Sequence, residues 1–286
     1  MSQIENTIKL NKPSRLKALK LDDILNRITT SKNNHFLSSY SQPSFIVGRL
    51  SDGQEICECL HEIGSIYITG KQKCGKTSFI KSIILQVQAK VDKGDVKFML
   101  LGEEGELGSI IADQRLTSFR GRGKTEISRG LSWLISEINR RYTIFSSERS
   151  FRYREYEHID ISRISRSQTT PILLVIIENY SKLVGKFPTK QKAEIENKLI
   201  KLLQQARAVG IYLILSTSEP AGTNKSHIMF SNFHSRITFK NTNRKSSIKN
   251  FDYPGTEKLL SYCDAIFYNP ILHIYLRVQT PFIDSV

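Results

Sequence analysis

Eight consecutive residues, Gly70 to Thr77, have the types and the spacing needed to hold a phosphate group. They read Gly-Lys-Gln-Lys-Cys-Gly-Lys-Thr, which fits the phosphate-loop pattern G-x-x-x-x-G-K-[ST] at every position. The glycines let the backbone curl around a phosphate so that successive N–H groups point at its oxygens, and a helix that begins at the loop adds its positive end. Lys76 is expected to reach the β- and γ-phosphates of a nucleotide, and the Thr77 hydroxyl to ligate Mg²⁺. We therefore predict an ATP–Mg²⁺ site formed by Gly70, Lys71, Gln72, Lys73, Cys74, Gly75, Lys76, Thr77 and Ser78.

ATP hydrolysis needs further groups, and the sequence supplies them incompletely. The apolar run 171–177 ends in Glu178 and Asn179, so Glu178 is a candidate to hold the magnesium ion, directly or through water. Asn179 cannot accept a proton, and the position where a base usually follows this acid is therefore vacant. After the next apolar run, Thr217 or Ser218 is a candidate to sense the γ-phosphate through a hydrogen bond. The predicted catalytic residues are Lys76, Glu178 and Thr217, and the predicted metal ligands are Thr77 and Glu178.

Apolar runs that alternate with helical patterns must position these residues. Residues 66–69 read as a short buried strand that runs into the phosphate loop, and an apolar helix leaves the loop from Ser78. Continuous apolar runs are typical of central strands in a parallel sheet, and the helices between them cover both faces. We predict an α/β fold with a mostly parallel central sheet and with the nucleotide at the carboxyl ends of the strands. The other predicted strands are 96–101, 171–177, 211–215, 236–239 and 265–267, the predicted helices are 131–145 and 192–208, and a hairpin joins 45–48 to 55–60.

The chain is strongly basic, with a net charge of +15. This charge favours a polyanionic partner such as nucleic acid, or an anionic membrane face; a basic composition without such a partner stays open. Residues 120–124 are expected to form a flexible basic loop, and residues 149–166 interleave arginines with aromatic side chains. Such segments can follow a phosphate backbone, although a solvated loop is the alternative for both. The candidates for DNA contact are Arg120, Arg122, Lys124, Arg152 and Arg154.

The domain organisation is expected to be simple. Residues 1–44 read as a basic extension and linker with one short helix at 21–28, and residues 45–286 as the nucleotide-binding domain. No charge-free apolar run reaches the length of a membrane span, and no signal peptide is visible. The four cysteines lack the spacing of a zinc site and indicate reduced thiols in a cytosolic protein.

Several of these stretches together resemble the motor domain of the FtsK/SpoIIIE family of DNA translocases, which also includes conjugation and type VII secretion ATPases. The resemblance covers roughly residues 45–280 in the family's order, and its most specific part is Ala-Arg-Ala-Val-Gly-Ile-Tyr-Leu-Ile-Leu-Ser-Thr at 206–217. The other parts are 45–49 with Gly53, the phosphate loop, 138–142, 171–183, 235–240, 255–260 and Asp264. The resemblance implies a RecA-like P-loop NTPase fold, double-stranded DNA as a partner, and a homo-oligomeric ring, as a hexamer. In such a ring, Arg236 is a candidate to act in trans on a neighbouring subunit; a surface residue at a strand end is the alternative.

The departures from the family's pattern fall on catalytic positions. The family's Asp-Glu-Phe-Ala-Asp-Leu is replaced here by Glu-Asn-Tyr-Ser-Lys-Leu at 178–183, and its Thr-Gln-Arg-Pro by Thr-Ser-Glu-Pro at 217–220. Loss of one positioned group typically costs a factor of about 10² or more in rate. The resemblance therefore implies an ATP-binding DNA translocase module, as found in conjugative or mobile elements, with weak hydrolysis or with groups borrowed from a neighbouring subunit.

The alternative function is that of a degenerate ATPase domain in a type VII secretion-like system, where the substrate is a protein. DNA binding distinguishes the two. Both functions imply a cytoplasmic location, and both are compatible with membrane association through a membrane-anchored partner.

Overall fold

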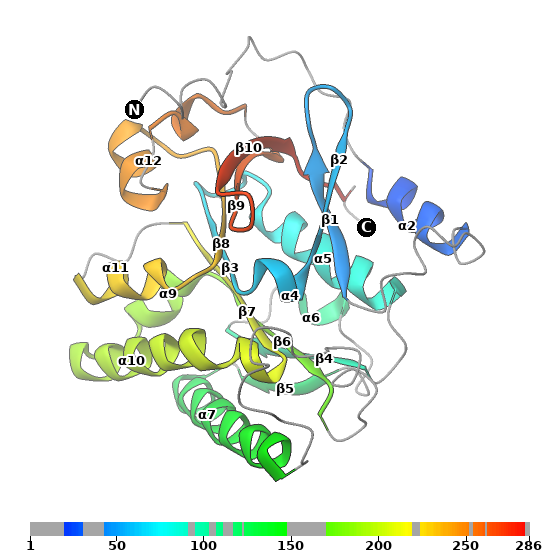
Figure 1. The fold of residues 1–286 in the computed structure, drawn as a ribbon. Coiled ribbons are helices and arrows are strands. Elements are labelled where there is room, and N and C mark those ends of the chain that lie inside the picture. The colour runs from blue at the N-terminus through cyan, green and yellow to red at the C-terminus, as the bar shows by residue number, and fades with distance from the viewer. Residues whose placement is uncertain are drawn as a thin grey trace. The chain divides into compact units, whose positions relative to one another are not determined.

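A computed structural model describes residues 20–30, 43–90, 95–102, 107–110, 117–121, 123–147, 170–218, 224–251, 254–260 and 262–283. The chain divides into two compact units (Figure 1). Unit 1 combines Met1–Val91, Ser216–Pro220 and His234–Val286, and unit 2 combines Asp92–Leu215 and Ala221–Phe233.

The strands are β1 (Ser44–Arg49), β2 (Glu55–Cys59), β3 (Ile66–Thr69), β4 (Val96–Leu101), β5 (Thr117–Gly121), β6 (Ile172–Ile177), β7 (Ile211–Thr217), β8 (Ser235–Phe239), β9 (Asp264–Asn269) and β10 (Ile274–Gln279). The helices are α2 (Leu21–Thr30), α4 (Leu60–Ile63), α5 (Lys76–Lys90), α6 (Leu107–Ile110), α7 (Lys124–Ser147), α9 (Tyr180–Gly185), α10 (Thr189–Gln205), α11 (Asn224–Ser231) and α12 (Arg244–Phe251), with 3-10 turns η3 (Arg207–Val209) and η4 (Thr256–Lys258).

Unit 1 contains a mixed sheet in the order β2-β1-β10-β9-β8-β3. β3 and β8 pair in parallel, and the remaining neighbours pair antiparallel. The α/β class predicted from the sequence is confirmed, but the parallel pairing does not extend over the whole sheet. β10 could not be predicted from the sequence, because its residues are mostly half-buried and form no continuous apolar run.

Unit 2 contains four parallel strands in the order β7-β6-β4-β5. Every residue of β6 and β7 is buried, as expected for strands covered on both faces. The flexible loop predicted at 120–124 is wrong at three positions, because Arg120 and Gly121 of β5 pair with Leu100 and Leu101 of β4 and Lys124 is the first residue of α7. β5 reads Thr-Ser-Phe-Arg-Gly and has a single large apolar residue, so a pattern of burial could not reveal it.

Helices α7 and α10 run side by side in unit 2 (Figure 1). Arg141 fixes α7 to its surroundings: its buried guanidinium donates to Glu137 Oε1 at 2.8 Å, to Val209 O at 2.9 Å and to Pro171 O at 2.8 Å. Tyr142 Oη donates to Gln205 O at 3.1 Å. The stretch 138–142, which contributed to the family resemblance, thus ties α7 to β6 and to the chain that leads into β7.

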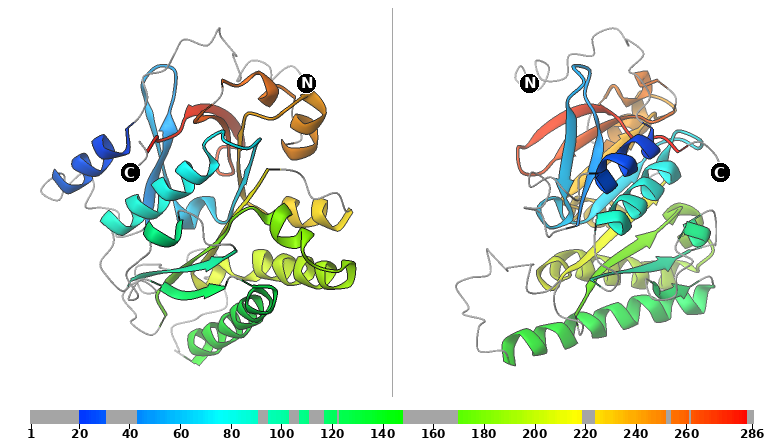
Figure 2. Two further views of the ribbon diagram at one scale, coloured as in Figure 1. Left: turned by 180° about the vertical axis from the view of Figure 1, so that it is seen from behind. Right: turned by 90° about the vertical axis from the view of Figure 1, so that its right-hand side faces the viewer.

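The short helix expected at 21–28 is present as α2, and it packs within unit 1. Ile24 is fully buried and contacts Leu25, Ile46 and Ala89, and both views of Figure 2 show α2 beside α5. Gln86 of α5 in turn accepts from Ile46 N at 2.8 Å. The division of the chain at residue 44 stays a prediction.

One buried acid in unit 1 has an altered proton affinity. Burial and, to a smaller extent, the negative charge of Glu62 raise the pKa of Glu58 from 4.5 to about 7, and a hydrogen bond from Asn269 opposes the rise. That bond joins Asn269 Nδ2 to Glu58 Oε1 over 2.6 Å. Glu58 therefore carries a proton in the folded protein below neutral pH.

Within the described residues, no helix has both the length and the apolar character needed to cross a membrane.

Candidate nucleotide-binding site

The phosphate loop connects the end of β3 to the start of α5, and its backbone passes through conformations that few residues adopt. Gly70 and Gly75 have φ angles of 140° and 110°, in the region that favours glycine. A Cβ on Gly70 would lie 2.8 Å from Phe239 Cβ, and one on Gly75 would lie 3.0 Å from the backbone nitrogen of Cys263. Glycine is required at both positions for the backbone angle and for the close approach of neighbouring chain.

Neighbouring segments of unit 1 hold the loop in this shape. Lys71 N donates to Lys240 O at 2.8 Å, and Cys263 N donates to Cys74 O at 3.0 Å. Inside the loop, Cys74 Sγ donates to Lys71 O at 2.8 Å. Burial raises the pKa of the Cys74 thiol, against the lowering effect of Lys76, and burial raises that of Cys263 to about 11. Both thiols are therefore protonated at neutral pH and act here as packing groups.

Lys76 directs its ammonium group into the loop. Its Nζ donates to Gly70 O at 2.8 Å and to Lys71 O at 2.7 Å, and the residue is only 8% exposed. Thr77 follows in the first turn of α5, which contains no acidic residue; a helix start of this kind favours a bound anion. The curled backbone, the lysine and the threonine together fit a nucleoside triphosphate with Mg²⁺.

The acid and the amide that follow β6 belong to unit 2. Glu178 is half-buried, and Asn179 is exposed with a φ of 53° at the start of α9. Asparagine tolerates this left-handed conformation better than most residues. Both residues line a hollow of about 20 Å³ with Lys182, Leu183 and Lys186, a volume that holds about one water molecule.

Three other predicted site residues lie at or near strand ends. Thr217 is fully buried as the last residue of β7, and Ser218 after it is half-buried. Arg236 lies in β8 opposite Tyr67 of β3. Burial raises the pKa of Tyr67, and the charge of Arg236 lowers it in part, so Arg236 lies close to the neutral Tyr67 hydroxyl of its own chain. Glu219 and Pro220 lie outside the described residues.

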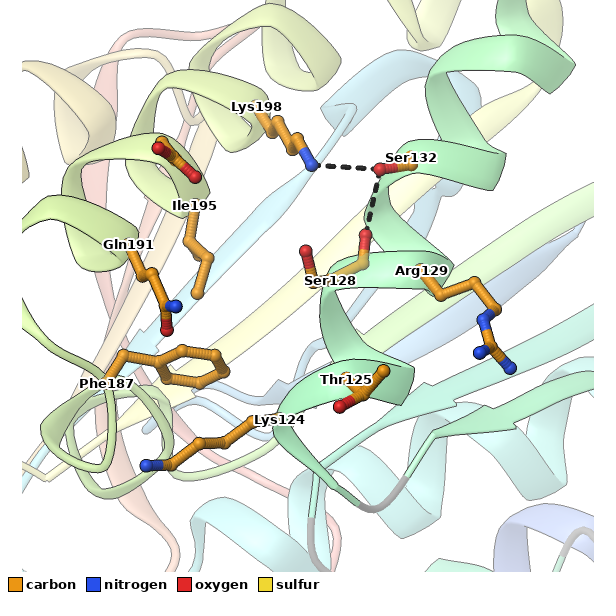
Figure 3. A pocket seen from close by; sticks show the side chains of 10 residues that line it. Lys124, Thr125, Ser128, Arg129, Ser132, Phe187, Gln191, Ile195 and Lys198 are labelled. Atoms are coloured by element: carbon orange, nitrogen blue, oxygen red, sulfur yellow. Dashed lines mark hydrogen bonds between the residues drawn. The ribbon is translucent and has the colours of Figure 1, made fainter.

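Of the five DNA-contact candidates, Arg122, Arg152 and Arg154 lie outside the described residues. Arg120 is part of β5, and Lys124 is the exposed first residue of α7. Lys124 lines a groove of about 560 Å³ between α7 and α10 (Figure 3), with its Nζ 5.8 Å from the centre of the Phe187 ring. The other lining residues are Thr125, Ser128, Arg129, Ser132, Gln191, Glu194, Ile195 and Lys198.

This basic groove, defined by the residues just given, was not anticipated from the sequence. The α7 residues that line the groove, at positions 124, 125, 128, 129 and 132, lie on one face of the helix. The predicted helix began at residue 131, so that face was not recognised. Across the groove, Lys198 Nζ donates to Ser132 Oγ at 2.9 Å, so one cation of α10 contacts the hydroxyl-bearing face of α7.

No group of three or more His, Cys, Asp or Glu side chains within the described ranges could hold a metal ion by itself. Mg²⁺ commonly binds through one or two protein oxygens together with phosphate oxygens and water, so Thr77 of the phosphate loop fits such a ligand, and Glu178 stays a ligand predicted from the sequence.

Comparison with known sequences gives one family. Residues 32–222 match the model of the FtsK/SpoIIIE family. The chain is 29% identical over 252 residues to a DNA translocase FtsK of Chlamydia trachomatis, covering 85% of this chain and 31% of the relative. It is 27% identical over 245 residues to a DNA translocase FtsK of Bacillus anthracis, covering 84% and 30%. The chain thus spans about a third of the length of the curated relatives it matches.

Solved structures with the same fold include ATPase modules. The cytoplasmic domain of the type VII secretion ATPase EccC of Thermomonospora curvata superposes with a TM-score of 0.67 at 14% identity, covering 86% of this chain and 29% of that one. The pCW3 conjugation coupling protein TcpA with ATPγS gives 0.66 at 16% identity, covering 85% and 67%. These similarities confirm the predicted P-loop ATPase fold.

Proposed function

The chain belongs to the FtsK/SpoIIIE family, and from that premise we propose that it is an ATP-binding module of a DNA translocase, with slow ATP hydrolysis. The observation that carries the proposal is the phosphate loop, in which Gly70 and Gly75 adopt left-handed angles and Lys76 is buried against the loop carbonyls. On binding, the β- and γ-phosphates would replace those carbonyls as partners of the ammonium. Thr77 would hold Mg²⁺, which supplies charge neutralisation at the phosphates, and Glu178 stays the second ligand that the sequence predicts.

Slow hydrolysis is supported by the group that follows Glu178. Asn179 has a side chain that cannot take a proton from water, and its left-handed backbone directs it differently from a residue within a regular strand or helix. Thr217 is fully buried at the end of β7 and is the proposed sensor of the γ-phosphate. A ring of subunits would allow Arg236 of a neighbour to add a positive charge, as arginine fingers do in other phosphoryl-transfer enzymes.

DNA contact is supported by the basic groove. Lys124, Arg129 and Lys198 contribute three cations against the single acid Glu194, and the hydroxyls of α7 offer hydrogen-bond donors to phosphate oxygens. Contacts of this kind bind the backbone without reading base sequence. We place Lys124 and Arg129 as phosphate contacts, with Arg120, Arg122, Arg152 and Arg154 as further candidates.

The first experiment measures ATP turnover of the purified chain with and without double-stranded DNA. The proposal predicts slow turnover that DNA increases. If duplex DNA changes neither turnover nor any binding signal, the translocase proposal fails, and a protein-export ATPase of the type VII secretion kind takes its place.

The second experiment measures the salt dependence of duplex binding for Lys124→Ala/Arg129→Ala and for a matched double variant, Arg244→Ala/Lys245→Ala. The control residues are exposed on α12 of unit 1 and remove the same charge. The groove variant should weaken binding and reduce the slope of log K against log salt by about one for each lost phosphate contact. Equal effects of the two variants would refute the groove as the contact site.

A further inference from the structure

A strained turn lies directly against the phosphate loop. Tyr262 and Cys263, which precede β9, have φ angles of 78° and 61°. Two successive non-glycine residues in the left-handed region are rare, and a bulky residue there is a genuine outlier. Such strain persists only where the surroundings fix it, and it concentrates at ligand sites.

The contacts of Cys263 account for how the turn is fixed. Its backbone nitrogen donates to Cys74 O in the phosphate loop at 3.0 Å, and its carbonyl accepts from Thr280 N at 2.8 Å. Its Sγ and N lie where a side chain on Gly75 would be. The turn is therefore clamped between the phosphate loop and the segment after β10.

The same backbone path leaves the Tyr262 side chain outside. Tyr262 is 44% exposed, while Cys263 is fully buried. The Tyr262 ring meets the Phe282 ring at a centroid distance of 5.0 Å and an interplanar angle of 72°, so an edge-to-face contact orients it. Among the described Phe, Tyr and Trp residues of unit 1, Tyr262 alone is exposed.

We infer that Tyr262, oriented by Phe282, is the surface on which the base of the bound nucleotide stacks. This inference rests on the proposed nucleotide binding at the phosphate loop. The loop binds only the phosphate tail, whereas a purine also needs a flat apolar partner. Tyr262 offers such a face one residue from the contact with Gly75, and the strained turn holds it there before any ligand arrives.

The test compares Mg-ATP with Mg-tripolyphosphate, which has the phosphates but no base. Calorimetric titration of the wild type, Tyr262→Ala, Tyr262→Phe and a control, Leu272→Ala, measures both affinities. Leu272 is 61% exposed in the turn between β9 and β10. Base–aromatic stacking corresponds to about five- to 150-fold in affinity.

Tyr262→Ala should lose affinity for ATP by that factor and keep its affinity for tripolyphosphate, whereas Tyr262→Phe and Leu272→Ala should resemble the wild type. If Tyr262→Ala binds ATP within about twofold of the wild type, the stacking inference is wrong and the phosphate-loop proposal stands. If Tyr262→Ala weakens both ligands equally, the turn supports the loop and does not bind the base. If the wild type binds neither Mg-ATP nor Mg-tripolyphosphate, both the phosphate-loop proposal and the stacking inference are wrong.

Discussion

Replacement of Lys76 by alanine changes two separate free energies. In the absence of nucleotide, the variant loses the bonds from Nζ to Gly70 O and Lys71 O, at 2.8 and 2.7 Å. A hydrogen bond to a charged group contributes about 1.5–3 kcal/mol, and removal of the ammonium also removes its desolvation cost. The net loss in the free energy of unfolding should be about 1–3 kcal/mol, or about 2–4 °C in Tm for each kcal/mol.

The second free energy is the stabilisation by ATP. At a concentration 100 times Kd, a ligand that binds only the folded state adds about 2.7 kcal/mol, and Lys76→Ala should lose most of this increment. Urea denaturation at several Mg-ATP concentrations measures both quantities for Lys76→Ala and for Lys249→Ala, a control residue exposed on α12. Unchanged stability without nucleotide would refute the buried lysine–carbonyl contacts, and a full ATP increment would refute the phosphate-loop assignment.

Asn179→Asp supplies a carboxylate on a residue type that tolerates the φ of 53°. This variant should raise ATP turnover about tenfold or more, whereas Asn179→Gln should not. Equal turnover of the two variants in a steady-state assay would show that a different group limits the rate. Gly75→Ala should abolish ATP-induced stabilisation and lower the free energy of unfolding by about 1–3 kcal/mol. Gly53→Ala should lower it less, since Gly53 has a φ of 93° but open space around it. Equal unfolding midpoints of the two variants would contradict the steric argument. The stability of the wild type should fall as pH rises from 4.5 to about 7, because folded Glu58 still holds a proton that the unfolded chain has released. The fall amounts to about 3 kcal/mol at most, and Glu58→Gln should remove it. Wild-type stability that rises across this pH window in urea titrations would contradict the assignment.

The sequence predicted well those elements whose burial is continuous. β3, β6 and β7 are apolar at almost every position, and the glycines, lysine and threonine of the phosphate loop have a fixed spacing. The buried strands of each unit and the loop were therefore predictable. The sheet edge β5 was not, because Arg120 and its neighbours form a strand through backbone pairing with β4 and carry no apolar pattern. The start of α7 was set too late for a similar reason: residues 124–129 are largely exposed, and only tertiary context shows that they continue the helix.

Contacts between distant segments were also beyond sequence reasoning. The left-handed angles of Tyr262 and Cys263 arise because the turn is held by the phosphate loop and by Thr280, and no local signal marks such a residue pair. Asn179 was predicted to leave the base position vacant, but its left-handed backbone angle was not foreseen. That angle makes aspartate the better test residue there than glutamate.

The hydrogen-bond partners of the phosphate loop affect the order in which parts of the protein can fold during translation. During translation the loop leaves the ribosome well before Lys240 and Cys263, which hold its backbone. Unit 2 lies in the sequence between the phosphate loop and these residues. Its parallel strands are joined by shorter connections than the one between β3 and β8, and shorter connections close at a lower entropic cost. The nucleotide pocket should therefore be among the last parts of the molecule to mature, and a nascent chain halted before β8 should fold its second unit without acquiring the capacity to bind ATP.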